Sequence, residues 1–378
     1  MKTAREIEYI VYFLLVVGLV FIYNSSIAHS QNIFGSPYRF FTLHLGWVAL
    51  GFLGFKIFSK IDYKKLVGLS PAMYIVTLVL LVFLAFWGLL PCTMSTSFAP
   101  CINNANRWLV FNPSPLPKLP FIGELSFQPS ELAKLAIVLF LAFKFKHLSK
   151  KAKSFSAYLL YASIYSMLVL LEPNMSTAII IFAIGSVMYI VSGETLKPFF
   201  YLLPVLALLF ITFVFISPYR RERLMTYMNK THATSSTEEG YQVKQVKIAL
   251  GSGGFFGVGF GQSRQKYTYL PEVTTDSIFA VIGEEFGFIG SFVISGAFLF
   301  LVLKALEVAK SANSFEGKLI ATGVATWLGV QFLIHMAANS GLIPYTGVPL
   351  PLISYGGSSL LFSMIAVGVL VNISRAKV

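Results

Sequence analysis

Long apolar runs are the feature of this sequence that most limits its fold. Runs of about twenty apolar residues recur from near the N-terminus to the C-terminus, and a helix needs about that many to cross the hydrocarbon core of a bilayer. The strands of an outer-membrane barrel are only about half as long. Backbone groups in hydrocarbon must also be hydrogen-bonded within their own segment. The runs therefore predict an all-α integral membrane protein.

Composition and charge agree with this prediction. Of the 378 residues, 56% are hydrophobic and only 12% are charged, whereas about a quarter of the residues in soluble proteins are charged. The net charge is +13, but the basic residues lie in short gaps between apolar runs instead of clustering on one polar face. This distribution argues against nucleic acid as a partner.

We expect about ten transmembrane helices in a single polytopic domain over residues 1–378. Nine spans beyond the first favour an uncleaved first helix over a signal peptide. The fifth and sixth spans are short and are candidates for a tight hairpin that does not fully cross the bilayer. The approximate ranges are 8–24, 42–58, 70–90, 130–148, 156–172, 175–192, 198–217, 277–303, 317–339 and 352–373.

Lys and Arg positions predict the orientation. With the N-terminus inside, the short inner segments hold most of the basic residues, and the short outer segments hold only Arg39, Arg107 and Lys118. The positive-inside rule then places both termini in the cytoplasm. Two outer regions result: residues 91–129, and the large extracytoplasmic loop 218–276 between the seventh and eighth helices.

The two cysteines of the chain, Cys92 and Cys101, both fall in the first outer region. An oxidising compartment and their short separation make a disulfide feasible. Two free thiols near a helix end are the alternative.

Several ionisable residues fall in or beside the apolar spans, where a charge is costly and therefore a functional candidate. Each also has a structural interpretation: an interfacial ion pair at i, i+3, a buried hydrogen-bonding histidine, or a helix cap. The residues are Glu131 and Lys134 in the fourth span, Glu172 at the end of the fifth, Glu284 and Glu285 in the eighth, His335 in the ninth, and Asp276 at the mouth of the eighth.

The long outer loop surrounds very few carboxylates with many cations. An amphipathic helix is expected over 239–250, and the glycine-rich stretch 251–261 is expected to be a turn against the membrane surface. Such a surface suits a lipid that carries pyrophosphate, with Glu272 or Asp276 as the proton acceptor, whereas simple binding of anionic head groups is the alternative. The loop cations include Arg220, Arg221, Arg223, Lys244, Lys247, Arg264 and Lys266.

Ordered motifs run from the third helix to the tenth. They include Asn106-Arg-Trp108, Phe127 to Lys134, Tyr219 to Leu224, Gly240 to Gln245, Tyr269 to Glu272, Thr275-Asp276, Ile278 to Glu285 and Gly341 to Ser359. In these motifs the chain resembles the SEDS family (shape, elongation, division and sporulation), especially its division branch, FtsW. The stretch 347–351 is similar to the elongation relative, RodA, so a RodA-type elongation polymerase is the alternative to the division branch.

The resemblance implies a ten-helix fold and a peptidoglycan glycosyltransferase that polymerises lipid II beside a class B penicillin-binding protein and other divisome proteins. It implies a place in the bacterial cytoplasmic membrane, at the division septum. The family's essential carboxylate maps onto Asp276. The chain departs from the family pattern at Asn174, Ser176, Thr274 and Ser277, where the family usually has Asp, Gly, His and Phe.

We interpret Asp276 as the general base of an inverting transfer, which deprotonates the acceptor hydroxyl. Cations would neutralise the leaving pyrophosphate, and a divalent ion such as Mg or Mn is a possible cofactor, although no metal-ligand motif appears. Glu131 would orient Lys134, Glu272 would position the acceptor or a metal, and Ser354 would shape the outer cavity. The expected substrate-binding residues are Arg107, Glu131, Lys134, Arg223, Gln242, Gln245, Lys266, Glu272 and Ser354.

Two other functions are open from the residues. One is a lipid II flippase that uses the polar residues inside the membrane as a pathway. The other is a scaffold that only recruits a transpeptidase.

Overall fold

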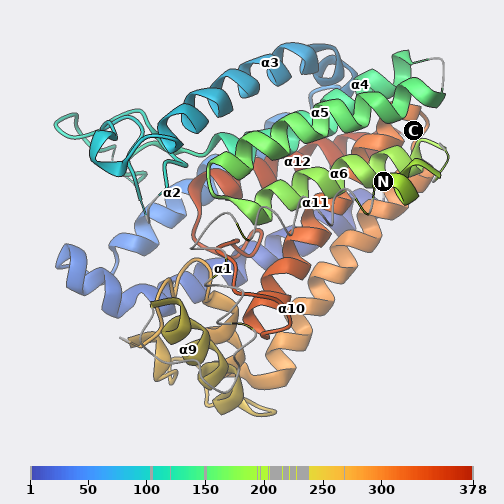
Figure 1. Ribbon diagram of the computed structural model, residues 1–378. Helices are drawn as coiled ribbons and strands as arrows, with labels where there is room; N and C mark the ends of the chain where they lie inside the picture. The colour runs from blue at the N-terminus through green and yellow to red at the C-terminus, as the bar shows by residue number, and fades with distance from the viewer. Residues whose placement is uncertain are drawn as a thin grey trace.

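The computed structural model describes residues 2–102, 105–119, 121–148, 151–193, 197–202, 238–267 and 269–376, and also the single residues 195, 204, 215, 221 and 227. It is a bundle of long helices (Figure 1). The helices are α1 (Lys2–Phe34), α2 (Arg39–Phe58), α3 (Tyr63–Gly88), α4 (Pro129–His147), α5 (Lys151–Leu171), α6 (Met175–Val191), α9 (Glu238–Gly253), α10 (Ile278–Ser311), α11 (Phe315–Asn339) and α12 (Gly357–Arg375).

An all-α membrane fold is confirmed. Six of the described helices, α1, α2, α3, α10, α11 and α12, are long and apolar enough to cross a membrane, and α6 and the 155–171 part of α5 are apolar but shorter. Nine of the ten predicted spans coincide with a helix. The seventh, 198–217, falls largely outside the described residues.

Helix ends differ from the predicted ends because hydropathy marks only the apolar part of a helix. The first helix extends from Lys2 to Phe34, well beyond the predicted 8–24. At the other end of the chain, the last helix begins later than the predicted residue 352. Residues 352–356 are not helical, and α12 begins at Gly357. There Leu352 has a φ of 64°, which a helix cannot contain.

Both termini lie at one end of the bundle, and α9 lies toward the other end (Figure 1). Ion pairs join the N-terminal helix to the ends of two others at the terminal end: Lys304 with Glu6 at 2.7 Å, and Arg375 with Glu8. The chain ends are therefore fixed at the same end of the bundle, and their placement in the cytoplasm stays a prediction.

The centre of the bundle depends on small residues that let helices approach closely. A methyl group on Gly323 of α11 would lie 2.9 Å from both Met188 of α6 and Val138 of α4. On α12, a methyl group on Gly357 would lie 2.3 Å from the ring of Trp47 in α2. These close approaches leave no room for a larger side chain at either position.

The region 91–129, which is predicted to lie outside, contains the short turn η1 (Cys92–Met94) and two antiparallel strands, β1 (Leu109–Val110) and β2 (Ser126–Phe127). Cys92 and Cys101 are joined by a disulfide, with their α-carbons 5.5 Å apart. Of the two alternatives open from the sequence, the structure has the bond.

The helix α10 is broken near its start. Gly287 has φ 62° and ψ −155°, which divides the helix into residues 278–286 and 288–311. The stretch 254–259 fills the break, because the amides of Val258 and Gly259 donate to the carbonyls of Glu284 and Glu285. The glycine-rich stretch therefore pairs with a helix break.

Candidate active site

Asp276 lies in the turn just before α10. Its side chain is half-buried. The main chain around it is held from two directions: the amide of Ser277 donates to the carbonyl of Glu272 at 3.1 Å, and Nδ2 of Asn339 donates to the carbonyl of Asp276 at 3.1 Å. The backbone of Asp276 is therefore held by a hydrogen bond to α11.

Residues 340–356, which connect α11 to α12, clamp the same turn. Oγ of Ser354 donates to the carbonyl of Thr275 at 2.6 Å, and the amide of Tyr355 donates to the carbonyl of Thr274 at 2.8 Å. Burial raises the pKa of the Tyr355 phenol to about 12, so this group stays protonated at neutral pH. Ser354 thus contacts the Asp276 turn through the main chain.

The helix α9 and the following 3-10 helix η2 (Gln265–Tyr267) precede the Asp276 turn in the chain. Nε2 of Gln242 lies 3.2 Å from the hydroxyl of Tyr345 and 3.3 Å from that of Ser277, and those two hydroxyls share a hydrogen bond of 2.8 Å. Gln245 is on the buried side of the same helix. The amphipathic helix predicted over 239–250 is confirmed, and it positions Gln242 beside the turn.

Glu272 lies at the start of the turn and is exposed. It has a φ of 48°, and its carboxylate accepts a hydrogen bond of 2.9 Å from Oγ1 of Thr275. This carboxylate therefore shapes the turn that presents Asp276. Its contact with an acceptor or a metal stays a prediction.

One face of α11 carries a row of polar residues that sequence reasoning largely missed. Trp327, Gln331, His335 and Asn339 recur every four residues, so they lie on one side of the helix. Nε2 of Gln331 donates to Pro349, His335 bonds to the carbonyl of Val348, and Asn339 bonds to Asp276. The four-residue spacing was the available signal, and only His335 was singled out from it.

The predicted pair in α4 reaches the same row. Nζ of Lys134 lies 2.8 Å from Glu131 and 2.8 Å from Oε1 of Gln331, and it stands 4.8 Å from the centre of the Trp327 ring. The side chains of Lys134 and Glu131 are 1% and 3% exposed. The i, i+3 pairing is confirmed. Along α11, Gln331 and Asn339 are separated by about 12 Å, at 1.5 Å per residue.

The remaining predicted cations have partners elsewhere or fall outside the described residues. Lys266 pairs with Glu285 and Asn24. Arg107 donates to the carbonyls of Glu172 and Pro173 at the corner between α5 and α6. Arg223 is outside the described residues. These contacts join Lys266 to α1 and α10 and Arg107 to the α5–α6 corner. Binding of substrate by Lys266, Arg107 and Arg223 stays a prediction.

Within the part of the chain that the structure describes, no three His, Cys, Asp or Glu side chains lie close enough together to hold a metal ion. A divalent cofactor therefore stays a prediction.

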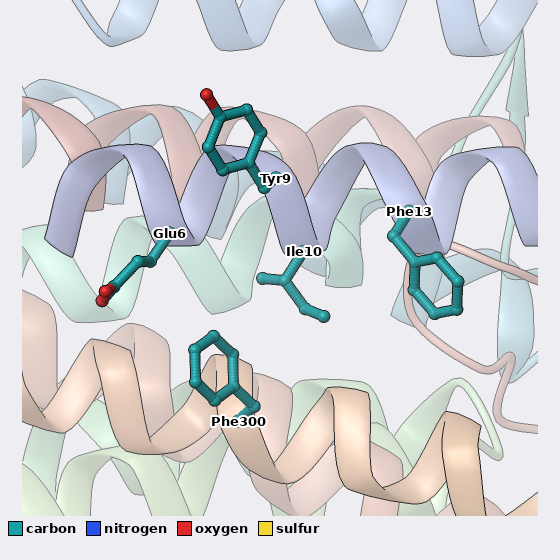
Figure 2. A pocket seen from close by; sticks show the side chains of 5 residues that line it. All are labelled: Glu6, Tyr9, Ile10, Phe13 and Phe300. Carbon is teal, nitrogen blue, oxygen red and sulfur yellow. The ribbon is translucent and has the colours of Figure 1, made fainter. Parts of the chain in front are cut away.

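A groove of about 370 Å³ lies between α1 and α10, near the terminal end of the bundle. Its lining is Glu6, Tyr9, Ile10, Phe13 and Phe300, and Figure 2 shows Ile10 directed toward Phe300 across the gap between the helices. It is almost wholly apolar and belongs to a different region from Asp276.

Comparison with known proteins decides the family. The family model described as a cell cycle protein, covering FtsW, RodA and SpoVE, matches residues 5–378. The chain belongs to this family. A probable peptidoglycan glycosyltransferase FtsW from Coxiella burnetii is 34% identical, over 96% of this chain and 93% of the relative. Stage V sporulation protein E of Bacillus subtilis is 31% identical, over 96% and 94%.

Solved structures agree with this membership of the FtsW, RodA and SpoVE family at the level of fold. A chain from a peptidoglycan synthase complex that coordinates polymerization and crosslinking superposes with a TM-score of 0.76 at 24% identity, covering 98% of this chain and 97% of that one. The rod shape determining protein RodA of Thermus thermophilus gives 0.68 at 23% identity, covering 98% and 96%. The multi-pass membrane fold is therefore shared.

Proposed function

We propose that this protein is a peptidoglycan glycosyltransferase that polymerises lipid II at the outer face of the bacterial cytoplasmic membrane. Membership of the FtsW, RodA and SpoVE family over nearly the whole chain supports the activity, since its FtsW relatives carry that name. The single observation that carries the site is the clamped turn, in which Asn339, Ser354 and Glu272 hold the backbone beside Asp276.

Asp276 is the general base of this reaction. Lipid II holds its sugar in an α-linkage to pyrophosphate and the polymer is β-linked, so one in-line displacement inverts the configuration. The carboxylate takes the proton of the acceptor 4-hydroxyl, the oxygen attacks the anomeric carbon, and the bond to pyrophosphate breaks. A positioned base contributes about 10²–10⁴-fold, and fixing its backbone beforehand removes much of the entropic cost of alignment.

Septal wall synthesis is the proposed role, because several of the curated relatives are FtsW proteins. A class B penicillin-binding protein that cross-links the new strands is the proposed partner, together with other divisome proteins. Both termini lie at one end of the bundle, and the distribution of Lys and Arg supports placing that end in the cytoplasm.

The deciding experiment is polymerisation of purified lipid II by the detergent-solubilised protein. Wild-type protein is expected to make glycan, and Asp276→Asn is expected to insert and fold normally yet make none. Glu124→Gln, at an exposed pair with Lys118, is the matched control and should keep full activity. Wild-type activity in Asp276→Asn would remove the assignment.

Two further arms separate the alternatives. Translocation of lipid II in proteoliposomes without polymer would support a flippase. If every variant with a substituted carboxylate still functions in cells, the protein acts as a scaffold. Polymerisation with and without EDTA tests the proposed divalent ion.

A further inference from the structure

A buried polar group joins α1, the loop that precedes Asp276, and α10. Nζ of Lys266 lies 2.8 Å from Oε1 of Glu285 and 2.7 Å from Oδ1 of Asn24, and Nδ2 of Asn24 donates to Oε2 of Glu285 at 2.5 Å. The side chains of Lys266 and Glu285 are 4% and 0% exposed. We call these three residues the Asn24–Lys266–Glu285 lock.

The neighbouring acid of α10 holds the same loop. Oγ of Ser263 donates to Oε2 of Glu284 at 2.5 Å, and the amide of Arg264 donates to Oε1 at 3.0 Å. The amide of Lys266 in turn donates to Oγ of Ser263 at 3.2 Å. Two consecutive carboxylates of α10 therefore fix residues 263–266 on the first segment of that helix.

This attachment is transmitted to Asp276 by packing. The amide of Leu270 donates to the carbonyl of Gln265, and Leu270 and Val273 belong to a small apolar cluster with Val246 of α9 and Val281 of α10. The turn that carries Asp276 is thus fastened at residues 263–266 on one side and to α10 on the other.

The break in α10 makes such a fastening necessary. Because Gly287 interrupts the helix, the membrane-spanning segment 288–311 does not by itself fix the direction of residues 278–286, which follow Asp276. That direction depends on side-chain and loop contacts. Among them, Glu284 and Glu285 meet the loop 263–266 directly.

We infer that Lys266 is a positioning residue, which acts through the lock to hold the Asp276 turn, and is not a ligand of the pyrophosphate. Its charge is already neutralised by Glu285, and a phosphate could reach it only by displacing that carboxylate from a buried site. This inference rests on the proposed function, since it concerns the geometry of the same reaction.

The test uses the full-length protein, lipid II and three variants: Lys266→Met, Glu285→Met and the double variant. Each single variant leaves one buried charge without its partner, which is costly. The double variant removes both charges with side chains of similar volume. Displacing a catalytic base by about 1 Å lowers the rate by about 10²-fold. Each single variant is therefore expected to lose about that factor in kcat, while its KM for lipid II stays within about 3-fold of the wild-type value.

Coupling in the double variant decides between the two roles. A positioning role predicts that the double variant is at least about 10-fold more active than either single variant, because the effects of substitutions at contacting residues are not additive. Lys266→Arg, which keeps the charge, should also be more active than Lys266→Met. A pyrophosphate ligand predicts instead a double variant as inactive as Lys266→Met, with a raised KM, and that result would overturn the inference.

A second measurement keeps the inference separate from the proposed function. Thermal unfolding of the same proteins should show a lowered midpoint for each single variant and recovery in the double variant, whatever the activity. Lys118→Met, at the exposed pair with Glu124, is the matched control. Absence of polymer from wild-type protein would defeat the proposed function alone, whereas additive losses of the unfolding midpoint would defeat the lock.

Discussion

The carboxylate of Asp276 lies directly against Gly347 in the connection between α11 and α12. A methyl group on Gly347 would stand 3.0 Å from Oδ2 of Asp276, which is closer than an ordinary van der Waals contact. The backbone of that connection therefore forms one side of the space that the carboxylate occupies. Nothing larger than hydrogen fits at position 347 without moving it.

Substitution of Gly347 should consequently impair catalysis more than stability. Gly347→Ala is expected to lower kcat by about 10-fold and Gly347→Val by about 10²-fold or more, because displacing a base by about 1 Å has that cost. Polymerisation of lipid II measures the effect. Gly296→Ala, where a methyl group meets no atom within 4 Å, is the control, and equal activity of all three variants would contradict the expectation.

The buried pair of Glu131 and Lys134 should be important for stability. Lys134→Met or Glu131→Gln leaves its partner charge buried, and breaking such a pair costs about 3–5 kcal/mol. The free energy of unfolding in detergent is the measurement. The exposed pair of Lys118 and Glu124 provides the comparison, since surface pairs contribute about 0–1 kcal/mol. Similar losses at both pairs would show that burial of the first pair has no effect.

The break at Gly287 should tolerate no side chain. Its φ of 62° is unfavourable for other residues, and a methyl group there would lie 2.4 Å from the amide nitrogen of Gly257. Strain at such a backbone position costs about 1–3 kcal/mol, to which the steric overlap adds. Gly287→Ala should therefore lower the thermal midpoint, whereas Gly296→Ala in the same helix should not. A midpoint unchanged in both would mean that the break is not required.

The disulfide between Cys92 and Cys101 should stabilise the outer region 91–129. Closing a short loop restricts the unfolded chain and contributes about 2–3 kcal/mol. The double variant Cys92→Ser/Cys101→Ser is expected to be cut faster in this region by an added protease. Reductant should have the same effect on wild-type protein and no effect on the variant. Equal cleavage rates with and without the bond would argue against this contribution.

Much of the site could be named from the sequence but not assembled from it. The i, i+3 spacing of Glu131 and Lys134 predicted their pairing, because one helix turn brings them together. By contrast, Lys266 meets Asn24, which is 242 residues away, and no local pattern connects them. Gln331 and Asn339 were overlooked because a polar residue in an apolar helix is recognised as functional only when its partner is known.

The sequence by itself determined the class of protein and the places where helices occur. A bilayer of fixed thickness requires spans of a certain length, and hydrocarbon requires each span to satisfy its own backbone. Tertiary structure alone decided that α10 breaks at Gly287, that residues 340–356 clamp the Asp276 turn, and that Lys266 faces Glu285. These features arise from packing between segments distant in the chain, and hydropathy carries no information about which segments become neighbours.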